Sequence, residues 1–152
     1  MDIFDALIKS HEVQRAICAR LLASVGDPER RTQAFSELKS ELAAHETAEE
    51  RAFYVPLFEH DDAVEAARHG IAEHHELDEM VEELEKLESG SAEWLETVGK
   101  LVHRIEHHLK EEEEKWFPVA RQVLTRGEQK ALGEPYQEEH ERLKAKEAAE
   151  GA

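Results

Sequence analysis

The sequence predicts an all-α protein, an up-down-up-down four-helix bundle with a short helical C-terminal extension. Three observations lead to this prediction. The chain has only 4 Pro and 7 Gly among its 152 residues. Its apolar side chains recur at steps of three and four residues, which is the spacing of one face of an α-helix. The segments between these periodic stretches are short, and short connections make successive helices antiparallel.

The first two helices are separated by a compact turn. The apolar pattern predicts the first helix over residues 3–25, with Gly26 at its end. Asp27 can then accept a hydrogen bond from the first turn of the next helix, because aspartate is a favoured N-cap residue. We expect this second helix over residues 28–55, where Pro56 disturbs its end.

Two further helices follow, joined by the clearest loop in the chain. The third is expected over residues 62–88 and the fourth over residues 92–117. The Ser-Gly-Ser segment at 89–91 has the composition of a turn between them. Pro118 marks the end of the fourth helix or a kink in it.

The tail is weakly apolar and is expected to contribute less to the core. A short helix near Glu128 and another from Pro135 are predicted there, the second fraying into the polar end of the chain. The predicted organisation is therefore a bundle over residues 1–124 and a partly frayed helical extension over residues 125–152.

Composition excludes several classes of function. The chain has 36 acidic and 19 basic residues, which gives a net charge of -17. Nucleic-acid and anionic-lipid surfaces attract clustered positive charge, so neither is an expected partner. There is no apolar run long enough to span a membrane and no secretory signal pattern at the N-terminus. The single cysteine, Cys18, suits a reducing compartment, and we expect a cytoplasmic protein.

Histidine is the unusual residue type, with ten in the chain. Four of them fall in phase with the apolar stripes, one on each predicted helix: His11, His45, His74 and His108. A lone histidine on an apolar face is usually a hydrogen-bonded core residue. Four imidazoles in one core are difficult to satisfy without a shared partner. A metal centre is such a partner, because neutral imidazole is a common ligand of transition metals.

Carboxylates accompany two of these histidines. Glu49 follows His45 by four residues, and Glu112 follows His108 by four, so each pair lies on one helix face. The spacing alone is weak evidence, since several other histidines share it. The pairs His69/Glu73, His75/Glu79 and His107/Glu111 are out of phase with the core and are interpreted as solvated. The nearest competitors to the core histidines are His75 and His107.

A short internal repeat supports this assignment. The segment HETAEERAFYVP begins at His45, and HLKEEEEKWFP begins at His108. In both, a His-x-x-x-Glu unit is followed by an aromatic pair and then by proline. Two acidic surface helices that end in aromatic side chains would give the same pattern, but would leave both histidines unpaired in the core.

Taken with DALIKSH and AEHHELDEMV, these segments resemble the haemerythrin-like, or HHE cation-binding, family over residues 3–124. The resemblance implies a four-helix bundle that holds a non-haem di-iron site with an oxo or hydroxo bridge. It also implies that Glu49 and Glu112 bridge two iron ions. The implied metal ligands are His11, His45, Glu49, His74, His108 and Glu112.

The chain departs from the oxygen-carrying members of that family in two ways. Those members have a fifth histidine four residues after the third-helix ligand, where this chain has Asp78. Their last carboxylate is an aspartate five residues after the final histidine, whereas here Glu112 is at the fourth position. We therefore expect oxygen to oxidise the reduced site instead of binding reversibly. Glu46, Tyr54 and Asp78 remain open as additional ligands.

The resemblance leaves functions of three kinds open. The first is a di-iron protein that binds or turns over oxygen, peroxide or nitric oxide, with catalase-like activity as one form. The second is an iron- or oxygen-sensing module that acts through a protein partner. The third is storage or handling of cations, including zinc. Whether the chain is an enzyme is left open by the sequence.

Overall fold

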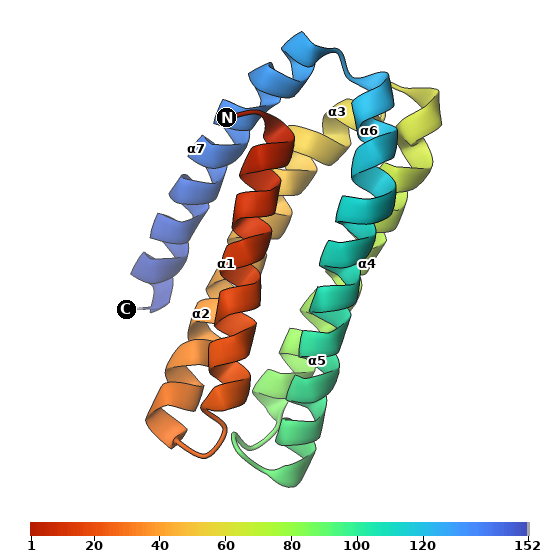
Figure 1. Cartoon of the computed structure of the whole chain (residues 1–152). Coiled ribbons are helices and arrows are strands. Elements are labelled where there is room, and N and C mark those ends of the chain that lie inside the picture. The colour runs from red at the N-terminus through yellow and green to blue at the C-terminus, as the bar shows by residue number, and fades with distance from the viewer. Residues whose placement is uncertain (152) are drawn as a thin grey trace.

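The chain folds as an all-helical bundle. The computed structural model describes residues 1–151, and these contain no strand. The long helices are α1 (Ile3–Ala23), α2 (Pro28–Glu49), α4 (Val64–Lys86), α5 (Ala92–Glu111) and α7 (Arg126–Gly151). Two short helices, α3 (Val55–Leu57) and α6 (Phe117–Val123), continue α2 and α5. Figure 1 shows the long helices running side by side, with connections at both ends of the bundle.

Side-chain caps fix where three of the helices begin. Asp2 accepts a hydrogen bond from the Asp5 backbone N–H at 2.8 Å, and Asp27 caps α2 in the same way. The Ser91 hydroxyl accepts from the backbone N–H of Trp94 at 3.1 Å at the start of α5. Each cap satisfies a backbone N–H that has no partner inside its helix. The predicted starts at residues 28 and 92 are confirmed.

Two wide π turns interrupt the helices that carry the repeated motif. They span Glu50–Tyr54 and Glu112–Trp116, and in each the following residue donates its backbone N–H to the carbonyl five residues earlier. Each turn ends two residues before a proline, Pro56 or Pro118. Proline lacks a backbone N–H, so the regular helical hydrogen bonds cannot continue there. The sequence predicted a disturbance at both prolines, but the helix continues beyond each as α3 or α6.

The C-terminal segment differs from the prediction of two short helices. It forms one helix, α7, which contains Pro135 and lies along α1 and α2 (Figure 1). Tyr136, a residue of α7, is fully buried. A Cβ at Gly133 would overlap the carbonyl oxygen of Met1, so glycine allows α7 to approach the N-terminus closely. Packing against the bundle therefore outweighs the local effect of proline and glycine.

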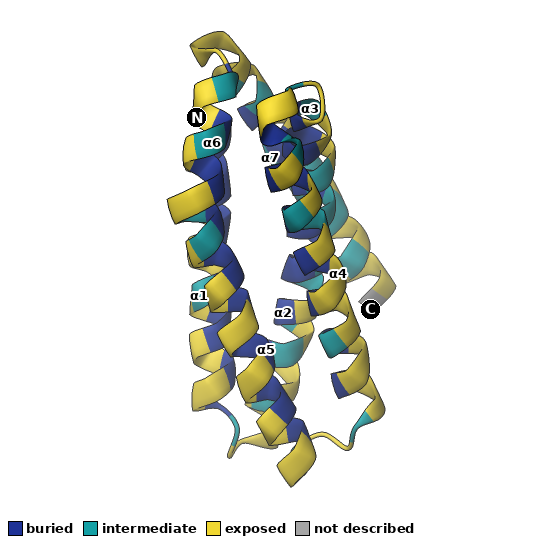
Figure 2. Ribbon diagram, turned by 90° about the vertical axis from the view of Figure 1, so that its right-hand side faces the viewer, coloured by how far each residue is buried: buried dark blue, intermediate teal, exposed yellow. Residues whose placement is uncertain are grey.

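The buried residues lie mainly on the inward faces of the helices (Figure 2). The cluster nearer α3 and α6 is aromatic and includes Phe4, Phe53 and Phe117. The cluster towards the opposite end is mainly aliphatic, with Trp94 among its members. Most of the buried polar residues lie along the helices between the members of the two clusters, with Ser24 and Thr97 as exceptions. No helix within residues 1–151 is both long enough and apolar enough to cross a membrane.

Candidate metal centre

The six residues predicted as metal ligands meet in the middle of the bundle. They form two groups, and in each group one ligand atom per residue lies within 4.8 Å of all the others. Every one of the six has an exposed fraction of 3% or less. Glu49 and Glu112 belong to both groups. The first group adds His11 and His45, and the second adds His74 and His108.

The helix register separates the buried histidines from their neighbours. His74 and His108 are 2% and 3% exposed, whereas His75 and His107 are exposed. Adjacent residues on an α-helix differ by about 100° in direction, so only one of each pair can face the core. The phase with the apolar stripe, which the sequence analysis used, selects the buried member in both cases.

The Nε2 atoms of the four histidines point at the two shared carboxylates. Glu112 faces His11 on α1 at 3.0 Å and His108 on its own helix at 3.4 Å. Glu49 faces His74 on α4 at 3.0 Å and His45 on α2 at 3.5 Å. Each carboxylate therefore joins a histidine of its own helix to one of another helix.

The opposite ring nitrogen of three histidines contacts a further carboxylate. The distances to His11, His74 and His108 Nδ1 are 2.7 Å from Glu113, 3.0 Å from Glu50 and 2.7 Å from Glu73. Carboxylate partners of this kind orient metal-ligating histidines and increase their basicity. The sequence analysis gave no role to Glu50 or Glu113, and its interpretation of Glu73 as part of a solvated pair was wrong, because Glu73 is buried against His108. The signal for two of them was present, because Glu50 and Glu113 directly follow the shared carboxylates.

His45 has a different environment. Its Nδ1 lies 2.7 Å from the hydroxyl of Tyr136 on α7 and 2.9 Å from the hydroxyl of Ser10 on α1.

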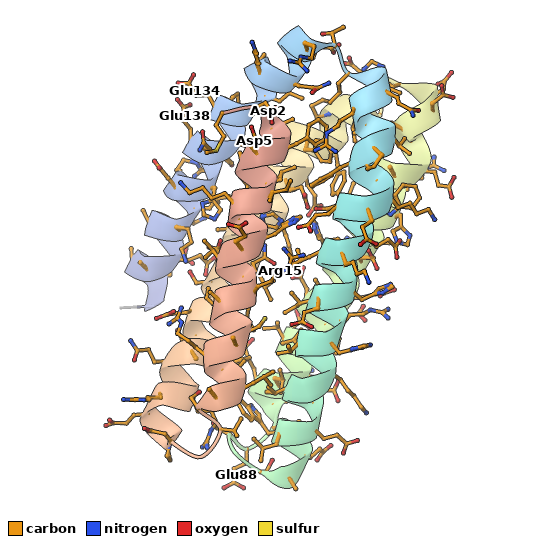
Figure 3. The ribbon with its side chains drawn as sticks, in the orientation of Figure 1. Asp2, Asp5, Arg15, Glu88, Glu134 and Glu138 are labelled. Carbon is orange, nitrogen blue, oxygen red and sulfur yellow. The ribbon has the colours of Figure 1, made fainter. Side chains whose placement is uncertain are left out.

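Arg15 contributes on the α1 side as well, where Figure 3 shows it midway along the helix. Its guanidinium donates two hydrogen bonds to Glu113, at 2.9 and 3.0 Å. Glu113 is thereby held against His11.

Most of the polar atoms at the centre are suited to bind metal ions and do not form hydrogen bonds with one another. The four Nε2 atoms, both oxygens of Glu49 and Oε1 of Glu112 are buried without a hydrogen-bond partner. Buried polar atoms of this kind are costly unless something satisfies them. Imidazole nitrogens with carboxylate oxygens suit first-row transition metals. Each of the two groups could hold a metal ion, and the two groups share both carboxylates.

The protonation of the histidines depends on what faces them. Burial lowers the pKa of His45 well below its usual value, which favours the neutral form that ligates metals. Burial also opposes the charge on His11, but the adjacent carboxylates of Glu112 and Glu113 raise its pKa to about 9. A bound cation must displace such a proton, so metal binding at this centre releases protons.

Tyr54 lies directly beside the centre. Its hydroxyl donates a hydrogen bond to Glu112, and burial raises its pKa well above the usual value, so it stays protonated. Tyr54 is the last residue of the π turn Glu50–Tyr54. A Cβ at Gly70 on α4 would overlap the Tyr54 ring. Glycine at this position therefore makes room for the tyrosine.

The other two open candidates lie outside both groups of ligand atoms. Glu46 is buried, and burial together with a hydrogen bond to Asp78 raises its pKa well above the usual value. Asp78 itself is exposed. The side chain at this position contacts Glu46, and each group is left with two imidazoles and two carboxylates.

The fold and the buried histidine–glutamate groups define a metal-binding helical bundle. Residues 2–120 match the family model described as the hemerythrin HHE cation binding domain, and the match includes all six predicted ligands. The chain belongs to this family. Comparisons with curated proteins and with solved structures gave no match. Helix α7, which provides Tyr136, follows the matched segment.

Proposed function

We propose that this protein is a non-haem di-iron protein that binds and turns over a small oxidant, with slow disproportionation of hydrogen peroxide as its activity. One observation carries the proposal. Six buried ligands form two groups that share two carboxylates, and most of their inward-facing atoms lack hydrogen-bond partners. We also infer that α1, α2, α4 and α5 form the predicted up-down-up-down four-helix bundle, to which α7 is added.

Iron is the metal that best fits the donor set and leaves room for a ligand. Each group offers two imidazole nitrogens and two shared carboxylates. Mixed histidine and carboxylate ligation with open positions is typical of non-haem iron sites that react with oxygen. The open positions would accept oxygen, peroxide or nitric oxide. Glu49 and Glu112 would hold the two metal positions at a fixed separation.

A pair of iron ions would accept and return two electrons, which is the exchange that peroxide disproportionation requires. In that reaction one peroxide is oxidised to oxygen and a second is reduced to two waters, so no other reductant is needed. The chain's part is to hold the ligands and to manage protons. Tyr54 Oη keeps a proton beside Glu112, and Ser10 Oγ bonds to His45 Nδ1.

A surface pocket provides a way towards these groups. It lies between α1, α2 and α7, and Ser10, Glu41, Tyr136 and His140 are among its lining residues. His140 contacts buried Glu41 at 3.0 Å, and the Ser10 hydroxyl lies 3.4 Å from the same carboxylate. Since Ser10 also contacts His45, a continuous chain of polar groups connects the pocket with the centre. Protons can follow this chain during turnover.

Metal analysis and a peroxide assay test the proposal. Protein supplied with iron should retain about two irons per chain, one for each group of ligands, and absorb in the near ultraviolet when oxidised. An oxygen electrode should record oxygen release from hydrogen peroxide, and the His74→Ala variant should lose it. One zinc per chain without such absorption would contradict the proposal and favour cation handling. Reversible oxygen binding by the reduced protein would restore the carrier function.

One feature favours a second candidate, an iron- or oxygen-sensing module. Helix α7 lies beyond the segment matched to the family and contacts the centre directly through Tyr136 and His45. A change of metal or ligand at His45 would alter how firmly α7 packs against α1 and α2, and a protein partner could bind the two states with different affinity. Hydrogen exchange of α7 with and without iron tests this. If the hydrogen-exchange protection of α7 is the same with and without iron, the sensing function is contradicted and the peroxide-disproportionation function is favoured.

A further inference from the structure

A second cluster of metal-ligating side chains lies on the outer side of α4 and α5. The sequence analysis treated His69/Glu73 and His107/Glu111 as two separate solvated pairs. In the structure they adjoin, because His69 Nε2 lies 2.6 Å from Glu111 Oε1 and 3.3 Å from Glu73 Oε1. The other oxygen of Glu111 lies 3.0 Å from His107 Nε2.

The three central members have the geometry of a small cation site. One ligand atom from each of His69, Glu73 and Glu111 lies within 4.8 Å of the other two. Metal–ligand bonds of about 2.1 Å place neighbouring ligand atoms about 3 to 3.5 Å apart around one ion. Distances of this order are already present between the helices, so an ion could bind with only small side-chain movements.

The cluster is held in place and its ring nitrogen is directed inward. The Nε2 atom of His69 is buried without a well-formed hydrogen bond, although the side chain as a whole is 39% exposed. Trp116 packs against the His69 ring at 5.3 Å, and its indole N–H donates to Glu111 at 3.1 Å. These contacts fix two of the three side chains before any ion arrives.

We propose that His69, Glu73 and Glu111 form an outer site for a divalent transition-metal ion, separate from the buried centre. One nitrogen and two carboxylates suit an ion such as Fe²⁺, Co²⁺ or Zn²⁺. The site is one side chain away from the buried centre, because Glu73 also contacts His108 Nδ1 at 2.7 Å. An ion bound outside would share Glu73 with that histidine.

Cobalt binding tests the site, with the fluorescence of Trp116 as the probe. Protein as isolated is washed with chelator and titrated with Co²⁺, with bound cobalt measured by equilibrium dialysis. Bound Co²⁺ should quench Trp116, which contacts His69, and leave Trp94, about 33 Å away along the helix direction, emitting. In the Trp94→Phe variant the remaining tryptophan is Trp116, so the quenching and the bound ion should both be unchanged.

Two variants and a control decide the result. His69→Ala should weaken the binding of one cobalt per chain by about tenfold or more, and Glu111→Gln should do the same if His69→Ala does not fold. His75→Ala changes an exposed histidine of the same helix and should leave binding unchanged. Equal cobalt binding in the wild type and both cluster variants would overturn the proposal, as would the absence of quenchable binding. Because only the ion that depends on His69 is counted, the result is independent of what the buried centre holds.

Discussion

The two halves of the buried centre are built differently, although the same pair of carboxylates joins them. In the half with His74 and His108, both histidines are backed by carboxylates, Glu50 and Glu73. In the half with His11 and His45, only His11 has such a partner, and His45 contacts the hydroxyls of Ser10 and Tyr136. Carboxylate partners make imidazole a stronger donor. We therefore expect the metal ion beside His45 to be held less tightly.

This difference has a structural origin. The repeated motif places a carboxylate after each shared glutamate, and these back His74 and His11 from neighbouring helices. The corresponding place beside His45 is covered by α7 instead. The half that we expect to hold its ion less tightly is therefore the one covered by α7, which lies outside the family match. Four sets of variants test this comparison.

The largest effect is expected from Glu49→Gln. Glu49 belongs to both groups, so its loss should remove metal from both halves, from about two ions per chain towards none. The matched control is Glu50→Gln, the adjacent residue, which contacts only His74 and should weaken one half. Elemental analysis after chelator washing measures both. Similar losses in the two variants would show that the halves are not joined through Glu49.

The next effect distinguishes neighbouring histidines. His74→Ala should lose metal from its half and destabilise the fold by about 3 to 5 kcal/mol, because the buried carboxylate of Glu49 and the half-buried carboxylate of Glu50 lose their partner. His75→Ala should change stability by less than about 0.5 kcal/mol, since that side chain is exposed. Denaturant unfolding of both variants provides the measurement. His108→Ala and His107→Ala should differ in the same sense in their retention of metal at the centre, and equal loss there would mean that the helix register is wrong.

A smaller effect separates the two kinds of histidine partner. Tyr136→Phe removes the hydroxyl at His45, and Glu50→Gln neutralises the carboxylate at His74. Each should accelerate metal release from one half only, and Glu50→Gln should do so more, by about 10 to 100-fold. Biphasic release to a chelator, followed optically, resolves the halves. If both phases of metal release are the same in Tyr136→Phe as in the wild type, α7 has no part in holding the metal.

The smallest effects concern two glycines on different helices. Gly70→Ala would place a Cβ against the Tyr54 ring, and such overpacking costs about 1 to 3 kcal/mol. Gly99 has no atom within 4 Å of a Cβ, so Gly99→Ala should stabilise α5 by about 0.5 to 1 kcal/mol. The midpoint temperature of thermal unfolding should therefore fall for Gly70→Ala and rise for Gly99→Ala. Stabilisation of both variants would mean that Tyr54 is free to move away from the centre.

Much of the site could be predicted because it lies on helices with a clear apolar face. His11, His45, His74 and His108 stand out since each replaces an apolar residue on a stripe. The two shared carboxylates follow from the repeated spacing within one helix. The Nδ1 partners of His108 and His45 could not be predicted in this way, because Glu73 lies on another helix and Tyr136 lies on α7.

Sequence alone determined the helical class, the starts of three long helices at residues 3, 28 and 92, and which face of each of the four bundle helices enters the core. These features depend on periodicity and capping within a few residues, where the chain's geometry is fixed. Tertiary structure decided that Pro135 lies within a continuous α7, that His69 meets Glu111, and that His45 is backed by a tyrosine. Each of these depends on the packing of separate helices, and the free energy of burial between them outweighs the local preferences that a sequence reveals.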